Sequence, residues 1–239
     1  RKVAAQKPVL IFKAGRTEQG ARASASHTGS LAGSTQVYDA VFKQAGAIQV
    51  RTWKDFWEIP KVFASQPLPK GNRIAIVTPT GGVGVVATDV AVEAGLALAQ
   101  LSDATVNRLA RLHPNLCRNP ADLGPIMVLT ANPLAVLETT IAAVLDDINV
   151  DCATIVLAAG IERWASATVT MLERLRQHIS KPVTIYIYGT NMPLTEEVAR
   201  QLQAMGLPTY LELETAVKAL GIAVQYTESK MNLGHEEGW

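Results

Sequence analysis

The residue best suited to covalent chemistry is His27, which lies in a stretch of small residues, GRTEQGARASASHTGSLAG at 15–33. Ser26 precedes it and Thr28 and Gly29 follow it, so hydroxyls and a flexible backbone flank the imidazole. Small side chains let backbone N–H groups approach an anion, and a neutral imidazole nitrogen is able to attack phosphorus. We therefore expect a long loop that holds a phosphate beside His27. The alternative is an ordinary solvated loop histidine.

A second candidate site is the glycine-rich stretch TPTGGVGVVATD at 78–89, which follows an apolar, β-branched run. Gly81, Gly82, Val83 and Gly84 begin a predicted helix, where free N–H groups and the positive end of a helix dipole coincide. The spacing differs from the dinucleotide fingerprint GxGxxG, and the glycines are not followed by the Lys-Ser/Thr pair of a P-loop. Phosphate binding is one interpretation, and an ordinary strand-to-helix turn of an α/β sheet is the other.

Composition excludes several classes of function. The 239 residues are 48% hydrophobic and 18% charged with a net charge of +1, which fits an α/β protein and favours neither nucleic acid nor a membrane as partner. The apolar runs are shorter than the ~20 residues of a membrane span. Cys117, Cys152 and the scattered histidines lack metal-site spacing, so we expect no metal ligands, reduced thiols and a cytoplasmic location. The chain begins with Arg1 in a helix-like turn, so we expect a piece of a longer protein.

The elements around His27 follow from local patterns. The predicted elements are strands at 8–12 and 47–50 and, between them, a helix that Ser34 caps and Gly46 ends. Thr52 and Asp55 fit a capping box that opens another helix, and Pro60 should kink it. The stretch SQPLPKGN at 65–72 has two prolines, a glycine and no periodicity, which predicts a domain boundary.

Strands and helices alternate after this boundary. The predicted strands are 73–78, 96–100, 154–158, 183–188 and 209–211, and the predicted helices are 81–94, 103–112, 132–147, 163–178, 195–205 and 212–220. This order predicts a parallel five-stranded sheet of the flavodoxin type with helices on both faces. The turns at 79–84, 119–124 and 159–160 should share its carboxyl edge, where such sheets bind ligands. From Val224 onwards the pattern is weak, and we expect a loose tail.

Two sets of motifs resemble one family, the NDP-forming acyl-CoA synthetases, which include succinyl-CoA synthetase and the ADP-forming acetyl-CoA synthetases. The first set is KPVLIFKAGR at 7–16, ASHTGSLAG at 25–33 and QAGAIQV at 44–50, which is similar to the histidine-bearing domain. The second set is RIAIVTPTGGVGVVATD at 73–89 and RNPADLG at 118–124, which is similar to a flavodoxin-like domain of the same enzymes. Together the two resemblances extend over nearly the whole chain to about residue 221.

The resemblance implies a domain plan and a reaction. Residues 1–66 would be the C-terminal part of the phosphohistidine-bearing α/β domain, 67–222 the flavodoxin-like domain and 223–239 a tail. His27 would be phosphorylated and would carry phosphate between an acyl phosphate and a nucleotide, with Ser26, Thr28, Gly29 and the 81–84 turn binding that phosphate. The activity expected is that of an ADP-forming acid–CoA ligase, which converts a carboxylate, CoA and ATP into acyl-CoA, ADP and phosphate.

The resemblance also implies components outside this chain. Coenzyme A and ATP or ADP with Mg²⁺ would be bound mainly by an upstream CoA-binding domain and by an ATP-grasp domain or subunit, and an oligomer is expected. The glutamate that orients the histidine in this family would also lie upstream, so this piece alone should be inactive. The alternative function is a non-catalytic, acyl-CoA-sensing regulatory module of a protein acetyltransferase. The presence of His27 favours the enzyme, because a sensor does not need that residue.

Several further residues have a structural interpretation beside a functional one. Asp122 in NPADLG is expected to brace its own loop. Arg16 and Arg22 are either phosphate contacts or solvated side chains. Trp53 and Trp57 are expected to pack in a core or a subunit contact.

Overall fold

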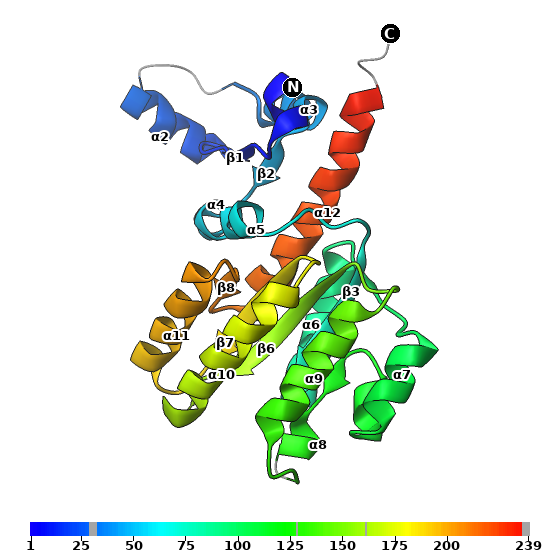
Figure 1. Cartoon of the computed structure of the whole chain (residues 1–239). Coiled ribbons are helices and arrows are strands. Elements are labelled where there is room, and N and C mark those ends of the chain that lie inside the picture. Colours follow the sequence, from blue (N-terminus) through cyan, green and yellow to red (C-terminus); the bar gives the residue numbers. More distant parts are fainter. Residues whose placement is uncertain (29–32, 128, 161, 236–239) are drawn as a thin grey trace. The chain divides into compact units, whose positions relative to one another are not determined.

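The computed structural model describes residues 1–28, 33–127, 129–160 and 162–235 (Figure 1). The chain divides into two compact units, one of Arg1–Pro60 with Gln225–Trp239 and one of Lys61–Val224. None of the described helices is both long and apolar enough to cross a bilayer.

The smaller unit is built around a two-stranded parallel sheet. Its elements are α1 (Lys2–Gln6), β1 (Leu10–Phe12), α2 (Glu18–Thr28), α3 (Thr35–Ala45), β2 (Ile48–Val50) and α4 (Trp53–Glu58). Strand β1 pairs with β2 in the register Leu10↔Ile48, so the two strands predicted here are confirmed. Gly46 ends α3 in the left-handed conformation, with φ of 71°, and Thr52 accepts the capping bond from the Asp55 amide at 3.0 Å, both as expected.

The expected long loop from residue 15 to residue 33 is wrong over 18–28, which form helix α2. The physical reason is local: the run ARASAS is rich in alanine, the best helix former. The Thr17 hydroxyl accepts from the Gly20 amide at 3.1 Å at the start, and Arg22 pairs with Glu18 one turn earlier. Gly29 and the rest of 29–32 lie outside the described residues.

The kink expected at Pro60 is confirmed as a helix break. Helix α4 ends at Glu58, and α5 (Pro60–Ser65) begins with the proline itself. Proline is compatible with the first position of a helix because its missing N–H would have no partner there.

The larger unit is a parallel α/β sheet of the flavodoxin type, as predicted. The remaining strands are β3 (Arg73–Thr78), β4 (Ala97–Leu98), β5 (Ala121–Asp122), β6 (Cys152–Ala158), β7 (Val183–Tyr188) and β8 (Thr209–Tyr210). They lie in the order β4-β3-β6-β7-β8, and β5 adds a short sixth strand beside β3. All pairings are parallel, with Ile74 opposite Cys152 and Ala153 opposite Val183.

Helices cover both faces of this sheet. They are α6 (Gly81–Glu93), α7 (Asp103–Ala110), η1 (Pro114–Cys117), α8 (Gly124–Met127), α9 (Pro133–Asp146), α10 (Glu162–Leu175), η2 (Arg176–His178), α11 (Met192–Ala204) and α12 (Leu213–His235). Figure 1 shows α9 and α10 in front of the sheet and α6 behind it. On the α6 side, α12 comes so close that a Cβ on Gly221 would stand 2.5 Å from the Ala94 carbonyl oxygen.

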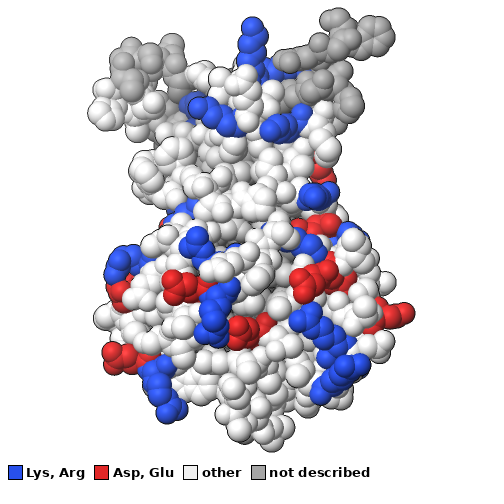
Figure 2. Space-filling view, in the orientation of Figure 1, with Lys and Arg blue, Asp and Glu red and all other residues white. Residues whose placement is uncertain are grey.

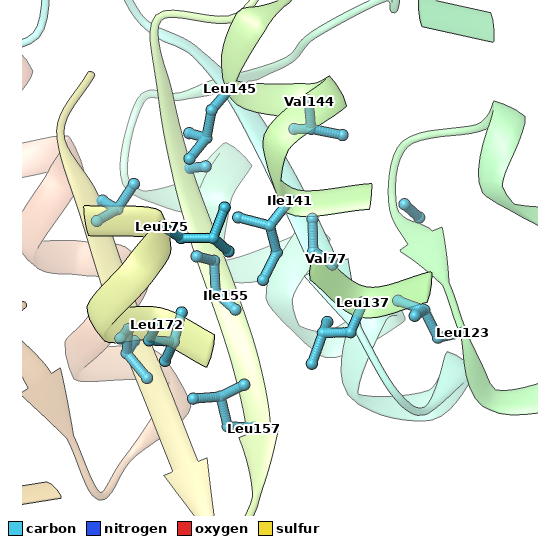
Figure 3. Packing of buried hydrophobic residues seen from close by; sticks show 14 of the residues in the cluster. Val77, Leu123, Leu137, Ile141, Val144, Leu145, Ile155, Leu157, Leu172 and Leu175 are labelled. Atoms are coloured by element: carbon cyan, nitrogen blue, oxygen red, sulfur yellow. The ribbon is translucent and has the colours of Figure 1, made fainter. Parts of the chain in front are cut away.

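The core of the larger unit lies between the sheet and the helices in front of it. Figure 3 shows Ile141 of α9 and Leu172 of α10 on either side of Ile155 from β6. These three side chains are at most 1% exposed. Strands β3 and β6 read as continuous apolar runs because both of their faces are covered.

The last helix is longer than predicted. The weak pattern after residue 223 suggested a loose tail, but α12 continues to His235. Tyr226 explains part of the difference, because it is 2% exposed and its hydroxyl donates to the Ala4 carbonyl oxygen at 3.0 Å. A buried aromatic side chain whose hydroxyl is hydrogen-bonded can stabilise a helical segment even where the hydrophobic periodicity of the sequence is weak.

Candidate functional site

The strand order of the larger unit reverses at β3. From β3 the chain first adds β4 on one side and then crosses to β6 on the other side. Parallel α/β sheets bind ligands beyond the carboxyl ends of their strands at such a reversal. Here those ends are Thr78 of β3 and Ala158 of β6, and the glycine turn at 79–84 and the loop at 119–124 lie at this edge.

The N-terminus of α6 presents unpaired amide donors at this edge. Thr80 is the N-cap but makes no side-chain capping bond. The first amide bonded within the helix is that of Gly84, which donates to the Thr80 carbonyl oxygen at 3.2 Å. Among the described residues, the N–H groups of Gly81, Gly82 and Val83 therefore have no acceptor. Such donors, together with the helix dipole, favour an anion.

The three glycines of this turn differ in the space around them. A Cβ on Gly81 would stand 2.8 Å from Oδ2 of Asp122, and one on Gly84 would stand 3.1 Å from Cγ2 of Thr78. A side chain at either position would therefore force its neighbour to move. A Cβ on Gly82 would meet no atom within 4 Å. Glycine weakens a helix, and the packing around Gly82 does not explain why glycine stands at this position. Gly82 leaves the end of α6 open to an approaching group.

Asp122 braces its own loop, as expected from the sequence. Its Oδ1 accepts from the Gly124 amide at 2.8 Å, while Oδ2 faces Gly81. The strand pairing of β5 with β3 places this carboxylate, with Asp122 opposite Thr78. An anion at α6 would therefore bind on the Gly82 and Val83 side, away from the negative charge.

The structure places His27 in the last turn of α2 with an exposed side chain. Ser26 is exposed as well, and its hydroxyl donates back to the Ala23 carbonyl oxygen at 2.8 Å. Thr28 is the last residue of α2, and Gly29 falls outside the described residues. An exposed imidazole at a helix end is accessible to a phosphoryl donor.

The two arginines near His27 differ in their surroundings. Arg22 is exposed and forms an ion pair with Glu18 on the surface of α2. Arg16 is half-buried; its carbonyl oxygen accepts from the Thr35 hydroxyl at 3.1 Å, and its Nε is buried without an acceptor among the described residues. The solvated interpretation therefore suits Arg22 better than Arg16.

Sequence reasoning missed an apolar crevice of about 230 Å³ at the same sheet edge. Its lining residues are Pro79, Leu123, Met127, Leu134, Leu137, Val156, Leu157, Ala158, Gly160, Trp164 and Thr168. In Figure 3, Leu123, Leu137 and Leu157 lie at the lower end of the buried cluster. The sequence carries no single signal for the crevice, because its walls come from segments that only the fold brings together.

The parallel α/β sheet and the exposed histidine agree with the resemblance to NDP-forming acyl-CoA synthetases that the sequence motifs carry. Residues 1–63 match the family model described as "Succinyl-CoA ligase like flavodoxin domain". This match falls on the smaller unit, so the flavodoxin-like character of the larger unit rests on its own strand order.

Curated relatives confirm the resemblance. The chain is 33% identical over 229 residues to the acetate–CoA ligase [ADP-forming] II of Archaeoglobus fulgidus, which covers 95% of this chain and 33% of the relative. It is 34% identical over 238 residues to the alpha subunit of the acetate–CoA ligase [ADP-forming] II of Pyrococcus furiosus, covering 96% of this chain and 50% of the relative. The homologues of this chain are thus ADP-forming acid–CoA ligases, and it spans half of their length or less.

A solved structure agrees with this relationship. The acetyl-coenzyme A synthetase 1 of Ca. Korarchaeum cryptofilum, in complex with phosphate and ADP, superimposes with a TM-score of 0.82 at 27% identity. The superposition covers 100% of this chain and 51% of that one. The mixed α/β architecture predicted from the sequence is therefore confirmed.

Proposed function

We propose that this chain is part of an NDP-forming acyl-CoA synthetase and that His27 carries the phosphoryl group in its reaction. The observation that carries the proposal is the presence, in a homologue of ADP-forming ligases, of an exposed imidazole and of three unpaired amides at a helix N-terminus. A carrier histidine must be reachable by two phosphoryl partners, and a transient phosphate needs donors that cannot themselves be phosphorylated. Backbone amides meet the second requirement.

The chemistry assigned to His27 is one phosphoryl transfer. A neutral imidazole nitrogen attacks the phosphorus of an acyl phosphate, the P–N bond forms, the bond from phosphorus to the acyl oxygen breaks, and the carboxylate leaves. In the reverse direction the phosphohistidine activates a carboxylate for attack by coenzyme A. In this proposal the unpaired amides of Gly81, Gly82 and Val83 bind phosphate at the start of α6, where Gly84 serves the packing of the turn because its amide already donates to Thr80. Ser26, Thr28 and Gly29 are assigned to the phosphoryl group carried by His27.

Other parts of the reaction need other components. Coenzyme A and ATP or ADP with Mg²⁺ bind mainly to a CoA-binding domain and an ATP-grasp domain outside this chain, and the substrate is a small carboxylate. The name of the Pyrococcus alpha subunit supports such a partner, since it implies at least one further subunit. A cytoplasmic oligomer with free thiols fits this proposal, and Cys117 and Cys152 are both unpaired.

The domain plan is part of the same proposal. Residues 1–66 supply the C-terminal part of the phosphohistidine domain, 67–222 the flavodoxin-like domain, and 223–239 follow them. The family model matches residues 1–63, which supports a domain boundary near residue 66.

The test is labelling of the full-length protein with γ-labelled ATP in the presence of its nucleotide-binding partner. We expect an acid-labile, base-stable label at His27 that a short carboxylate with coenzyme A discharges. The His27→Asn variant should show only background label, and the matched His178→Asn variant, which changes another exposed histidine, should label normally. Full labelling of His27→Asn would overturn the proposal. Absence of label together with intact binding of a coenzyme A thioester would support the sensor of a protein acetyltransferase instead.

A further inference from the structure

One edge of β3 is shared by two short strands that leave a gap between them. Strand β4 pairs with the start of β3 as far as Ile74, and β5 pairs with its end from Val77 onwards. Neither register includes Ile76, which is 0% exposed. The main chain at Ile76 therefore needs a partner from outside both strands, because a buried amide without an acceptor is costly.

The side chain of Asn119 fills this gap. Its Oδ1 accepts from the Ile76 amide at 2.9 Å, and its Nδ2 donates to the carbonyl oxygens of Ile74 at 2.8 Å and of Ala99 at 3.0 Å. One side-chain amide thus uses both of its N–H donors and its oxygen on main-chain groups. These groups belong to β3 and to the residue just after β4, and all three residues are at most 3% exposed.

Asn119 also begins the loop that touches the turn at the start of α6. A Cβ on Gly84 would stand 3.3 Å from Cβ of Pro120, the residue after Asn119. A Cβ on Gly81 would stand 2.8 Å from the carboxylate of Asp122 in the same loop. The loop therefore meets both ends of the glycine turn, and its position limits the position of the turn.

The other end of this loop is attached to β3 as well. Strand β5 consists of Ala121–Asp122, and the Leu123 amide donates to the Thr78 carbonyl oxygen at 2.8 Å. The three hydrogen bonds of Asn119 fasten the first residue of the loop. A segment held at both ends has fewer conformations than one held at a single end, so Asn119 narrows the range of positions open to the loop.

We propose that Asn119 is a positioning residue: by fastening the 119–124 loop to β3, it sets the direction of the amides of Gly81 and Gly82. Its three hydrogen bonds all go to main-chain groups, so it acts through the loop and not on a ligand. The direction of the amides matters because a hydrogen bond weakens steeply as it bends. This inference rests on the proposed phosphate-binding role of the turn.

The test uses two changes at Asn119 and one matched control. Asn119→Ala removes all three hydrogen bonds, whereas Asn119→Asp keeps an acceptor for the Ile76 amide and loses both donors. Asn149→Ala is the control, because Nδ2 of Asn149 also donates to a main-chain carbonyl oxygen near β4, that of Gln100 at 3.0 Å. Asn149 lies before β6 and not in the loop that touches the α6 turn.

The first measurement needs no ligand. In the full-length protein with isotope-labelled glycine, the amide NMR signals of Gly81 and Gly82 report the geometry of the turn. We expect both Asn119 variants to shift these signals and Asn149→Ala to leave them in place. A merely structural role would lower the melting temperature of all three variants without moving the two glycine signals of the folded protein.

The second measurement is the affinity for inorganic phosphate, followed at the Gly82 amide well below each melting temperature. Asn119→Ala should bind phosphate about tenfold more weakly than wild type, because misdirected donors lose most of their interaction. Asn119→Asp should lose at least as much, since its carboxylate faces two carbonyl oxygens that have lost their donors. Asn149→Ala should bind phosphate as wild type does.

The outcomes separate this inference from the proposed function. Unchanged Gly81 and Gly82 signals in the Asn119 variants would overturn the positioning role, and so would phosphate affinities equal to that of Asn149→Ala. Should Asn119→Ala fail to fold, Asn119→Asp decides by the same two measurements. Failure of phosphate to shift Gly82 in the wild-type protein would overturn the phosphate-binding role of the turn, while the ligand-free signals would still decide whether Asn119 sets its geometry.

Discussion

The two units of this chain differ in how they hold their functional groups. In the larger unit, β3, β6 and β7 are almost completely buried, and the amides of α6 are fixed to the end of that sheet. In the smaller unit, α3 has no buried residue, and His27 is exposed at the end of α2. The larger unit thus presents its unpaired amides at the end of a buried sheet, whereas the smaller unit presents His27 on its surface.

The units also differ in charge. Basic residues outnumber acidic ones over residues 1–60, while acidic residues slightly outnumber basic ones over 61–224. In Figure 2, both signs are interspersed over the larger unit, whereas the charged side chains visible on the smaller unit are mostly basic. A surface rich in basic side chains raises the local concentration of anionic ligands. Ion pairs occur in both units, such as Arg22 with Glu18 in the smaller one and Arg108 with Asp146, at 3.1 Å, in the larger one.

The largest expected effect tests the difference in core packing. Ile155→Ala removes a side chain that is 1% exposed at the centre of the larger unit, and we expect a loss of about 2–5 kcal/mol in its free energy of unfolding. Val37→Ala in α3, where Val37 is 61% exposed, should change stability by less than about 0.5 kcal/mol. Urea unfolding followed by circular dichroism measures both. Similar losses for the two variants would contradict the contrast between the units.

The second effect concerns the buried carboxylate of Asp147, which lies before the start of β6 and so at the amino edge of the sheet. Asp147 is 2% exposed and accepts from the Ser102 amide and the Asn149 amide, each at 2.8 Å. Burial alone would raise its pKa, but hydrogen bonds from Thr105, Asn149 and Ser102 outweigh burial and hold the pKa below its usual value. We expect Asp147→Asn to cost about 1–3 kcal/mol of stability at pH 7.

The sign of the pH dependence follows from the lowered pKa. A carboxylate with a lowered folded-state pKa stabilises the protein above its unfolded pKa of about 4, and this contribution is lost as pH falls through the folded value. The Arg73 hydrogen bond likewise lowers the pKa of Asp151. The stability difference between wild type and Asp147→Asn should therefore shrink from pH 7 towards pH 3. A constant difference across urea titrations at several pH values would show that Asp147 acts only through packing.

A smaller effect compares two helix starts within the smaller unit. Thr52→Ala removes the bond at 3.0 Å to the Asp55 amide and should cost about 1 kcal/mol. Ser34→Ala is the matched control, because Ser34 is also an N-cap but its side chain makes no capping bond. Hydrogen exchange of the first-turn amides of α4 and α3 measures the two local effects. Equal destabilisation of both helices would contradict this assignment of the cap.

The smallest expected effect is a gain. Gly82→Ala adds a Cβ to open space in the first turn of α6, so we expect stability to rise by about 0.4–1 kcal/mol. Gly81→Ala should instead lower stability, because its Cβ would stand 2.8 Å from the Asp122 carboxylate. If Gly82 serves an approaching phosphate, its alanine variant should bind inorganic phosphate more weakly while melting at a higher temperature. A variant that is more stable and binds phosphate normally would contradict that role.

The sequence by itself determined the elements whose signals are local. The β-branched run of β3, the capping residue Thr52 and the stop at Gly46 each act on their immediate neighbours, so their patterns predict structure directly. The alternation of strands and helices likewise fixed a parallel sheet, because parallel strands require crossover connections. The small residues around His27 made it a candidate nucleophile, and the family resemblance of the SHTG segment favoured that role over a solvated loop histidine.

Only the tertiary structure decided the features that depend on contacts between distant segments. Tyr226 donates to Ala4 and thereby supports a helix where a tail was predicted. Gly81 and Gly82 look alike in sequence, and the carboxylate of Asp122 distinguishes them because β5 pairs with β3. The apolar crevice at the sheet edge exists only because five separate segments meet there. Packing between residues far apart in the chain leaves no periodic trace along it, and it is this packing that shapes the site.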